Sequence, residues 1–374
     1  MVLAALCAIV LCGILVAGLW PFNPCPENEV SWLPKENGLR FGDYGTLFSS
    51  GEFHFTESLT DKSCSLEIWL QPALTNDSNN ILAFYSREDP LQFSIGQTGD
   101  SLFIRHGIQD EKRPLRHPVI IVEHAFRKDQ RLLVSVTSDG QVADIYLNGV
   151  QAATSKDFGL TSGAFGGRLV VGNSPIENNS WSGDLWGIAI YKRALSSLEI
   201  RQHYGAWVDG GNIEIAGNNG QLAAYVFDER AGRVVHNKAL SQPDLHIPEH
   251  YTILAPAFLE PPWKEFRPNW DYCKDVLENI AAFIPLGFFF CAYFSSVLRV
   301  KWALPGTIIL GGVVSLTIEV LQAFLPMRDS GITDIITNAA GTAAGAMLYC
   351  RKPVWTLFTK ISHPEKETEA RRPV

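Results

Sequence analysis

The chain lacks the residues that several classes of function require. No two of its seven cysteines form a C-x-x-C pair of the kind that binds zinc or performs redox chemistry. Only Cys25, Cys64 and Cys273 lie in polar surroundings, where one disulfide is an option. Histidine is absent from Tyr251 through Ser362, which excludes a Ser–His or Cys–His nucleophile there. Without a phosphate-binding glycine loop or a basic stripe, nothing indicates nucleotide-driven transport or a nucleic-acid partner.

Charged side chains are missing from Met1–Phe22 and sparse between Ile280 and Cys350, although the chain carries a net charge of −8. A helix needs about 20 mostly apolar residues to cross a bilayer. We expect four membrane spans, and they are Val2–Leu19, Ile280–Leu298, Trp302–Leu325 and Ile332–Cys350. The first has no basic start and no clear small-x-small cleavage site, which favours a retained anchor over a cleaved signal peptide.

Basic residues in the loops predict how these spans are oriented. Arg299 and Lys301 lie between the second and third spans. The cations that follow the fourth span are Arg351, Lys352, Lys360, Arg371 and Arg372. Short loops rich in Lys and Arg stay on the cytoplasmic side. We therefore predict a multi-pass protein of the cell membrane with both termini cytoplasmic and the long segment between the first two spans outside.

That long segment has the pattern of an antiparallel β-sandwich. Short runs rich in β-branched and aromatic residues are separated by Gly, Asn, Asp and Ser, without long helical periodicity. The clearest runs are Ser65–Leu70, Leu102–Arg105, Leu132–Thr137, Ala143–Leu147 and Arg168–Gly172. Asp139-Gly140 and Asn148-Gly149 favour tight hairpin turns, because both dipeptides tolerate positive φ.

The order of several motifs resembles the LamG-like, concanavalin A-like jelly roll. The motifs are Leu66–Pro72, Ile145–Gly149, Leu169–Asn173, Trp181–Tyr191 and Ala194–Ser196. The resemblance implies an all-β jelly-roll sandwich. Domains of this fold often bind carbohydrate, some of them with calcium.

Two sets of side chains in this segment are candidates for binding. Trp181 and Trp186 could stack on sugar rings, although aromatic residues in strands more often belong to the core. The candidate calcium ligands are Asp43, Asp139, Asp144 and Asp184. They do not form the closely spaced set of carboxylates that a calcium loop needs, which favours solvated turns. We predict no cofactor, with calcium in the jelly roll as the alternative.

A second set of motifs, around the first span and the last three, resembles the VanZ-like family. The residues are Trp20-Pro21-Phe22, Asp275, Asn279, Phe283, Pro285, Gly287, Ser315, Glu319, Gln322, Arg328, Asp334, Asn338, Gly341 and Gly345. The resemblance implies an α-helical transmembrane bundle of four helices with the jelly roll inserted after its first helix. The family is associated with reduced susceptibility to glycopeptide antibiotics of the teicoplanin type, which implies a link to resistance but no mechanism.

The polar residues of these spans predict a cluster near the outer membrane face. On each span they are spaced about one helical turn apart, so they share a face. The cluster consists of Asp275, Asn279, Ser315, Glu319, Gln322, Arg328, Asp334 and Asn338. We expect Arg328 to neutralise Glu319 or Asp334 through a bidentate contact. The cluster is either a ligand-binding site or interhelical glue. Gly341 and Gly345 form a G-x-x-x-G pair that permits close helix packing.

We predict five parts. These are the first transmembrane helix 1–22, the jelly roll 41–205 with an extension 206–253, the return segment 254–274, the VanZ-like bundle 275–350 and the cytoplasmic tail 351–374. We expect a non-catalytic envelope protein whose jelly roll binds glycan or a protein partner. Its bundle would anchor it in the lipid bilayer and bind a lipid-linked or amphipathic ligand. The alternatives are an intramembrane enzyme that acts on an envelope lipid or its head group through the carboxylates, and a membrane-anchored adhesion module.

The predicted orientation can be tested by labelling single cysteines in intact cells with a membrane-impermeant reagent. A cysteine in the middle segment, for example Ser138→Cys, is expected to react from outside, because that segment is predicted to be external. Lys352→Cys is expected to react only after the membrane is opened. Labelling of Lys352→Cys in intact cells would contradict the orientation.

Overall fold

A computed structural model describes residues 1–54, 62–110, 113–210, 220–239, 242–266, 270–297 and 300–351. The chain forms two compact units, one made of Met1–Pro24 with Ala257–Val374 and the other of Cys25–Pro256. Several predictions fall partly or wholly outside the described residues. They concern Arg299, Lys352, Lys360, Arg371 and Arg372, most of the tail 351–374, and the parts 211–219 and 240–241 of the extension.

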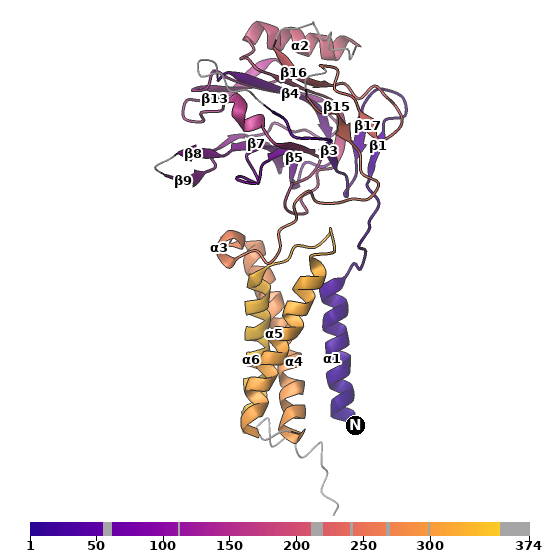
Figure 1. The fold of residues 1–374 in the computed structure, drawn as a ribbon, viewed down its shortest axis with the longest axis vertical. Helices are drawn as coiled ribbons and strands as arrows, with labels where there is room; N and C mark the ends of the chain where they lie inside the picture. The colour runs from indigo at the N-terminus through magenta and orange to yellow at the C-terminus, as the bar shows by residue number, and fades with distance from the viewer. Residues whose placement is uncertain are drawn as a thin grey trace, which may run out of the picture. The chain divides into compact units, whose positions relative to one another are not determined.

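The second unit is a sandwich of two antiparallel sheets (Figure 1). Over the described residues, one sheet has the order β1-β2-β15-β4-β11-β12-β13, with β16 also paired to β15. Its strands are β1 Val30–Trp32, β2 Leu39–Phe41, β4 Cys64–Pro72, β11 Leu132–Ser138, β12 Ala143–Leu147, β13 Val150–Ser155, β15 Gly183–Tyr191 and β16 Gln221–Tyr225. This sandwich confirms the predicted jelly-roll fold.

The other sheet has the order β10-β7-β6-β5-β14-β3-β18-β17. Its strands are β3 Leu47–Ser49, β5 Ser78–Tyr85, β6 Phe93–Thr98, β7 Ser101–His106, β10 Val119–Val122, β14 Arg168–Val171, β17 Val234–Val235 and β18 Leu245–His246. The unit also contains a small hairpin, β8 Ile108–Asp110 with β9 Arg113–Arg116, and a 3₁₀ turn at Ser162–Phe165. The last strands, β16 to β18, come from the extension and pair onto both sheets.

Strand β4 is buried on both of its faces. Leu66, Ile68 and Leu70 point into the core between the two sheets, because alternate residues of a strand face the same side. Trp69 lies on the opposite face and packs in a separate apolar cluster under helix α2, Ser197–Gly210. Its ring stacks on that of Trp207 with 5.8 Å between the ring centroids. The helix therefore covers a sheet face that would otherwise expose large aromatic side chains.

The helix α2 begins with a capping box. The Ser196 hydroxyl accepts the Glu199 backbone N–H at 3.3 Å, and the Glu199 carboxylate accepts the Ser196 backbone N–H at 2.8 Å. This reciprocal pair satisfies two donors that the first helical turn leaves free. It fixes where the helix starts and so where it meets the sheet.

The two predicted hairpin turns are confirmed. Asn148 and Gly149 both have positive φ, 52° and 79°, between the paired strands β12 and β13. The Asp139 carboxylate accepts the backbone N–H groups of Gln141 and Val142, which closes the turn between β11 and β12.

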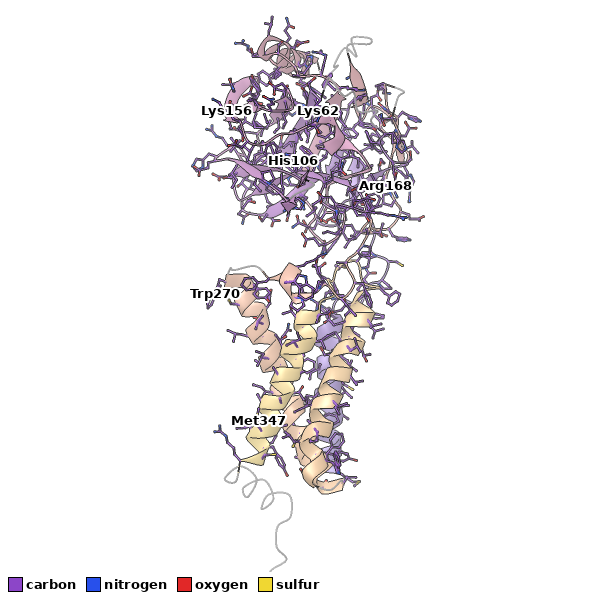
Figure 2. The ribbon with its side chains drawn as sticks, turned by 60° about the vertical axis from the view of Figure 1, so that its left-hand side comes forward. Lys62, His106, Lys156, Arg168, Trp270 and Met347 are labelled. Atoms are coloured by element: carbon purple, nitrogen blue, oxygen red, sulfur yellow. The ribbon has the colours of Figure 1, made fainter. Side chains whose placement is uncertain are left out.

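Ser138 is buried and donates its hydroxyl to the Leu160 carbonyl, so the exposed Lys156 (Figure 2) is the better position for the labelling experiment.

A polar network lies buried beneath α2. The Glu67 side chain on β4 is fully buried, and it accepts hydrogen bonds from the hydroxyls of Ser135 and Tyr191. The Nδ1 atom of His203, on α2, lies 2.8 Å from the same carboxylate. The hydrogen bond to Glu67 raises the pKa of His203, because the carboxylate stabilises the protonated ring.

The first unit is helical. Its helices are α1 Val2–Leu19, α3 Pro262–Glu265, α4 Trp270–Val297, α5 Val300–Gln322 and α6 Ile332–Cys350. Three of the described segments are long and apolar enough to cross a membrane: Val2–Leu19, Tyr272–Val297 and Trp302–Gln322. The predicted count of four spans is therefore not confirmed. The fourth expected span forms α6, which is rich in Thr, Ala and Gly and packs between α4 and α5.

Cys64, one of the three cysteines considered for a disulfide, forms no disulfide bond in the described part of the chain. Cys64 is fully buried in β4 between the two sheets. Burial raises the pKa of its thiol to about 12, because the thiolate would lose its hydration. Cys64 is therefore a small core residue in this fold.

The His203–Glu67 pair predicts a pH-dependent stability. A group whose pKa is raised by folding stabilises the folded state below its unfolded pKa, which is about 6.5 for histidine. That stabilisation is lost as the pH rises through the higher folded pKa. We expect the melting temperature of the protein to fall over this range, and His203→Gln to flatten the dependence. His236→Gln, at an exposed histidine beside Glu229, is the matched control. An unchanged pH profile in His203→Gln would contradict this role.

Candidate functional site

The candidate site lies in the helical unit, where α5 ends and α6 begins. Trp270, at the start of α4, and Met347, near the end of α6, lie toward opposite ends of this unit (Figure 2). The short connection after α5 places the start of α6 at the same end as Trp270. Polar residues of four helices meet there.

Two carboxylates cap the start of α6. Glu319, on α5, is 1% exposed and accepts the Gly331 backbone N–H at 2.8 Å. Glu265, at the end of α3, accepts the Thr333 backbone N–H at 3.1 Å and also the Thr333 hydroxyl. The first N–H groups of a helix have no partner within the helix, and its N-terminus attracts negative charge. The two carboxylates therefore fix the start of α6 against α5 and α3.

Further hydrogen bonds tie α6 to α4 and α5. The Asn279 amide, on α4, donates to the Asp334 carboxylate at 2.7 Å. The Asn338 amide donates to the Ser315 hydroxyl at 2.9 Å, and that hydroxyl lies 3.5 Å from the Asp334 carbonyl oxygen. These residues were predicted to gather, and the structure places their side chains along one seam between the three helices.

Arg328 does not take the role that the sequence predicted. Among the described residues, no ion pair joins it to Glu319 or Asp334. Its guanidinium donates instead to the carbonyls of Ala17 and Gly18, each at 3.2 Å. Gln322 donates to the Gly18 carbonyl at 2.8 Å. These carbonyls belong to the last turn of α1, where orphan acceptors and the negative end of the helix dipole favour a cation.

Asp275 lies at the edge of the candidate site. It is exposed on α4, one turn before Asn279, which holds Asp334. Among the described residues, no hydrogen bond reaches the Asp275 carboxylate, whereas Asp334 is bound by Asn279.

Several polar atoms at this end of the bundle are buried without a hydrogen-bond partner among the described residues. They are the Oε1 atom of Gln322, the Nε atom of Arg328 and the Oδ1 atom of Asn338. A buried polar group without a partner costs about 1–3 kcal/mol, and folded proteins seldom tolerate one. The cluster therefore has a hydrogen-bonding capacity that its structural contacts do not use.

Glycine allows α4 and α6 to approach closely beneath the cluster. A Cβ atom on Gly341 would lie 2.2 Å from the Ile280 carbonyl oxygen, and one on Gly345 would lie 2.0 Å from that of Ile284. A Cβ atom on Gly287 would lie 2.0 Å from the Thr342 carbonyl oxygen. The two backbones are in direct contact, which sets the register that brings Asn279 to Asp334.

Sequence reasoning did not find Glu265, Ser330, Gly331 or Thr333. Glu265 lies in a segment that was interpreted only as a return to the membrane. The available signal was Gly331, directly before the apolar run of α6, since glycine is accepted at the position that precedes a helix. A Cβ atom on Gly331 would lie 1.6 Å from a Glu265 carboxylate oxygen, so the caps also explain the glycine.

The candidate residues of the jelly roll have structural partners. Trp181 is buried in the core and donates to the Gln97 side chain, and Trp186 packs against Trp69. Asp184 pairs with Arg40 at 2.7 Å, and Asp43 accepts the Ser182 hydroxyl. Asp144 accepts from Gln151 and Thr154, while Asp139 closes its own turn. Within the described parts of the chain, no three acidic, histidine or cysteine side chains are placed to hold a metal ion.

Comparisons with known proteins match the two parts of the chain to different families. The profile described as VanZ/LLP1 matches residues 226–356. The profile of the concanavalin A-like lectin/glucanases superfamily matches residues 48–201. A comparison with curated proteins found no match. The chain thus combines a VanZ-like region with a concanavalin A-like domain, as the motifs predicted.

Solved structures resemble the chain only distantly. A putative carbohydrate binding protein from Bacteroides ovatus is 15% identical with a TM-score of 0.41, and 56% of this chain aligns with 57% of that chain. A heptameric SAP-like pentraxin from Limulus polyphemus is 15% identical with a TM-score of 0.35, covering 61% of this chain and 94% of that one. This chain thus spans a little over half the length of the Bacteroides protein.

The glycine contacts predict different effects on stability for two substitutions of the same type. Gly345→Ala places a methyl group on the Ile284 carbonyl and is expected to destabilise the helical unit by about 1–3 kcal/mol. Gly312→Ala, on α5, meets nothing within 4 Å and is the matched control. It is expected to leave stability unchanged or raise it by about 0.5–1 kcal/mol, because alanine favours helix. Thermal melting in detergent measures both. Equal melting temperatures would contradict the close α4–α6 contact.

Proposed function

Because the chain joins a VanZ-like region to a concanavalin A-like domain, we propose that it is a multi-pass envelope protein that displays a glycan-binding jelly roll. The observation that carries the proposal is the position of the jelly roll in the chain. It lies between α1 and α4, which both contain segments long and apolar enough to cross a membrane. A segment that lies between two consecutive membrane spans must be on one side of the membrane, so the whole jelly roll is on that side in this proposal.

The proposed orientation places the jelly roll outside the cell and both termini inside. The support is the distribution of Lys and Arg in the short loops, since long domains are exported regardless of their own charge. In this proposal, residues 41–205 with their extension bind the ligand, and residues 275–350 with the first helix hold the domain at the membrane.

The helical unit has a second role in the proposal. An anchor needs no buried carboxylates, and ionisable groups within spans are costly unless they serve a pairing or a site. Here Glu319 and Asp334 are engaged, yet Asn338 and Gln322 retain buried polar atoms without described partners. We infer that this end of the bundle binds the polar head of a lipid-linked or amphipathic ligand. The VanZ resemblance relates that ligand to teicoplanin-type glycopeptides or to the envelope components that they affect.

An intramembrane enzyme is the competing function, and the buried carboxylate of Glu319 is the observation that favours it. Its Oε2 atom accepts the Gly331 N–H, and the carboxylate keeps further lone pairs that acid or base chemistry could use. A binding screen with purified full-length protein against envelope lipids and glycans separates the two functions. Recovery of an unmodified ligand supports binding, and recovery of a converted one supports catalysis. Removing the jelly roll then assigns each ligand to one unit.

A conservative substitution tests the role of the cluster. Glu319→Gln keeps an oxygen that can accept the Gly331 N–H, so it removes the charge while preserving the cap. We expect it to abolish the teicoplanin response of an expressing host while leaving expression, insertion and melting temperature near those of the wild type. Glu278→Gln, at an exposed residue of α4 that pairs with Lys274, is the matched control and should keep the response.

Two outcomes would contradict a functional cluster. If Glu319→Gln mainly lowers the melting temperature and the response falls in proportion to the folded protein, the cluster is interhelical glue. If Glu319→Gln and Glu278→Gln both behave as wild type, the charge of Glu319 has no role in the response.

A further inference from the structure

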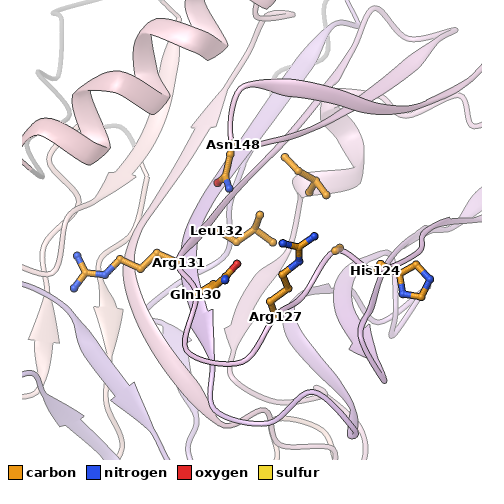
Figure 3. A pocket seen from close by; sticks show the side chains of 8 residues that line it. His124, Arg127, Gln130, Arg131, Leu132 and Asn148 are labelled. Carbon is orange, nitrogen blue, oxygen red and sulfur yellow. The ribbon is translucent and has the colours of Figure 1, made fainter.

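The jelly roll carries a half-open pocket of about 270 Å³ that the sequence motifs did not indicate (Figure 3). One wall is the loop that joins β10 to β11, and the other is the Asn148 turn between β12 and β13. Strand β10 is the edge of one sheet and β13 is the edge of the other. The pocket therefore opens where the two layers of the sandwich part at their edges.

Three cationic side chains line the pocket, but two of them are already paired. His124 lies 2.5 Å from the Asp100 carboxylate. Arg131 pairs with Glu36 at 2.6 Å, and its guanidinium lies 4.1 Å from the centre of the Trp186 ring. Within the described residues, no hydrogen bond or ion pair engages the Arg127 guanidinium, which points toward the middle of the pocket in Figure 3.

The remaining lining combines amide groups with an apolar floor. The side chains of Leu132, Leu147 and Ala125 line it, and Leu132 and Ala125 are buried. The Asn148 side-chain oxygen accepts the Leu133 backbone N–H, which leaves its amide hydrogens as donors, and Gln130 adds a second amide. An apolar floor beneath a few polar groups and one unpaired guanidinium suits a small hydroxylated ligand with an anionic group.

The backbone around the pocket is held in an uncommon conformation. His124, Asp129 and Asn148 have positive φ values of 55°, 57° and 52°, although none is glycine. Residues in this region cost about 1–3 kcal/mol when they are strained, and they gather where a binding loop must hold a fixed shape. His124 and Asp129 thus give the loop between β10 and β11 its shape at the pocket.

We propose that this pocket binds an acidic sugar, with its anionic group on Arg127 and its ring on the apolar floor. The proposal rests on the proposed glycan-binding function of the jelly roll and names the site and the ligand class. The volume is somewhat below the ~300–1,000 Å³ of drug-sized ligand pockets, so the site takes about one sugar unit. A carboxylate and a phosphate both match a guanidinium, so either can supply the charge.

The test measures binding of small sugars to the full-length protein in detergent by calorimetry or ligand-observed NMR. The probes are glucuronate, glucose 6-phosphate and glucose. We expect at least one acidic sugar to bind at least tenfold more tightly than glucose, which corresponds to about 1.4 kcal/mol. The stronger of the two acids identifies the source of the charge. Arg127→Gln is expected to remove the tenfold preference.

Lys128→Gln is the matched control, because it removes the same charge from the neighbouring exposed residue, which does not line the pocket. It should retain the preference for the acidic sugar within about twofold. Thermal melting of both variants checks that each is folded.

The outcomes separate this inference from the function on which it rests. A preference for acidic sugars that survives Arg127→Gln would overturn the pocket while leaving glycan binding in place. Binding of glucose as tight as that of the stronger acid would also overturn it. If neither these probes nor any glycan in the wider screen binds, both the pocket and the proposed function of the jelly roll fall.

Discussion

The helical unit depends on one constraint, which is that the ends of buried helices must have partners for their free backbone groups. Glu319 and Glu265 supply acceptors to the first turn of α6, while Gln322 and Arg328 supply donors to the last turn of α1. An unsatisfied group of this kind would cost about 1–3 kcal/mol, and the cost would be greater in hydrocarbon, where water cannot substitute. These contacts hold the ends of helices that are far apart in the sequence.

The same constraint operates in the jelly roll. Strand β4 is buried on both faces, so the carboxylate of Glu67 cannot reach bulk water. Its carboxylate is hydrogen-bonded to Ser135, Tyr191 and His203 in place of water, and His203 belongs to the helix that covers this face. Apolar packing around Trp69 and the hydrogen bond from His203 to Glu67 together hold α2 on this face.

The sequence predicted the elements of this protein better than the partners of its polar groups. Alternation of apolar residues and the Asn148-Gly149 turn identified the sandwich, because these signals are local. Composition also predicted the membrane spans. The helix α6 is less apolar than the other long helices, because its neighbours cover its small and polar residues. The sequence predicted that Arg328 pairs with a nearby carboxylate. In the structure its guanidinium instead donates to a carbonyl at the end of α1, more than 300 residues earlier in the chain. No local signal connects those two segments.

Those long-range contacts bear on the choice between glue and function. A purely structural cluster needs one hydrogen-bonded pair at each helix–helix contact to set the register. The bonds from Asn279 to Asp334 and from Asn338 to Ser315 already supply these pairs. Close contact through Gly341 and Gly345 fixes the same register without any polar group. The free oxygens of Asn338 and Gln322 are therefore surplus to packing, and leaving them buried works against stability. Packing does not require this cost, which favours a binding role for the two contacts where it occurs, Gln322 of α5 beside the end of α1 and Asn338 of α6 beside Ser315 of α5.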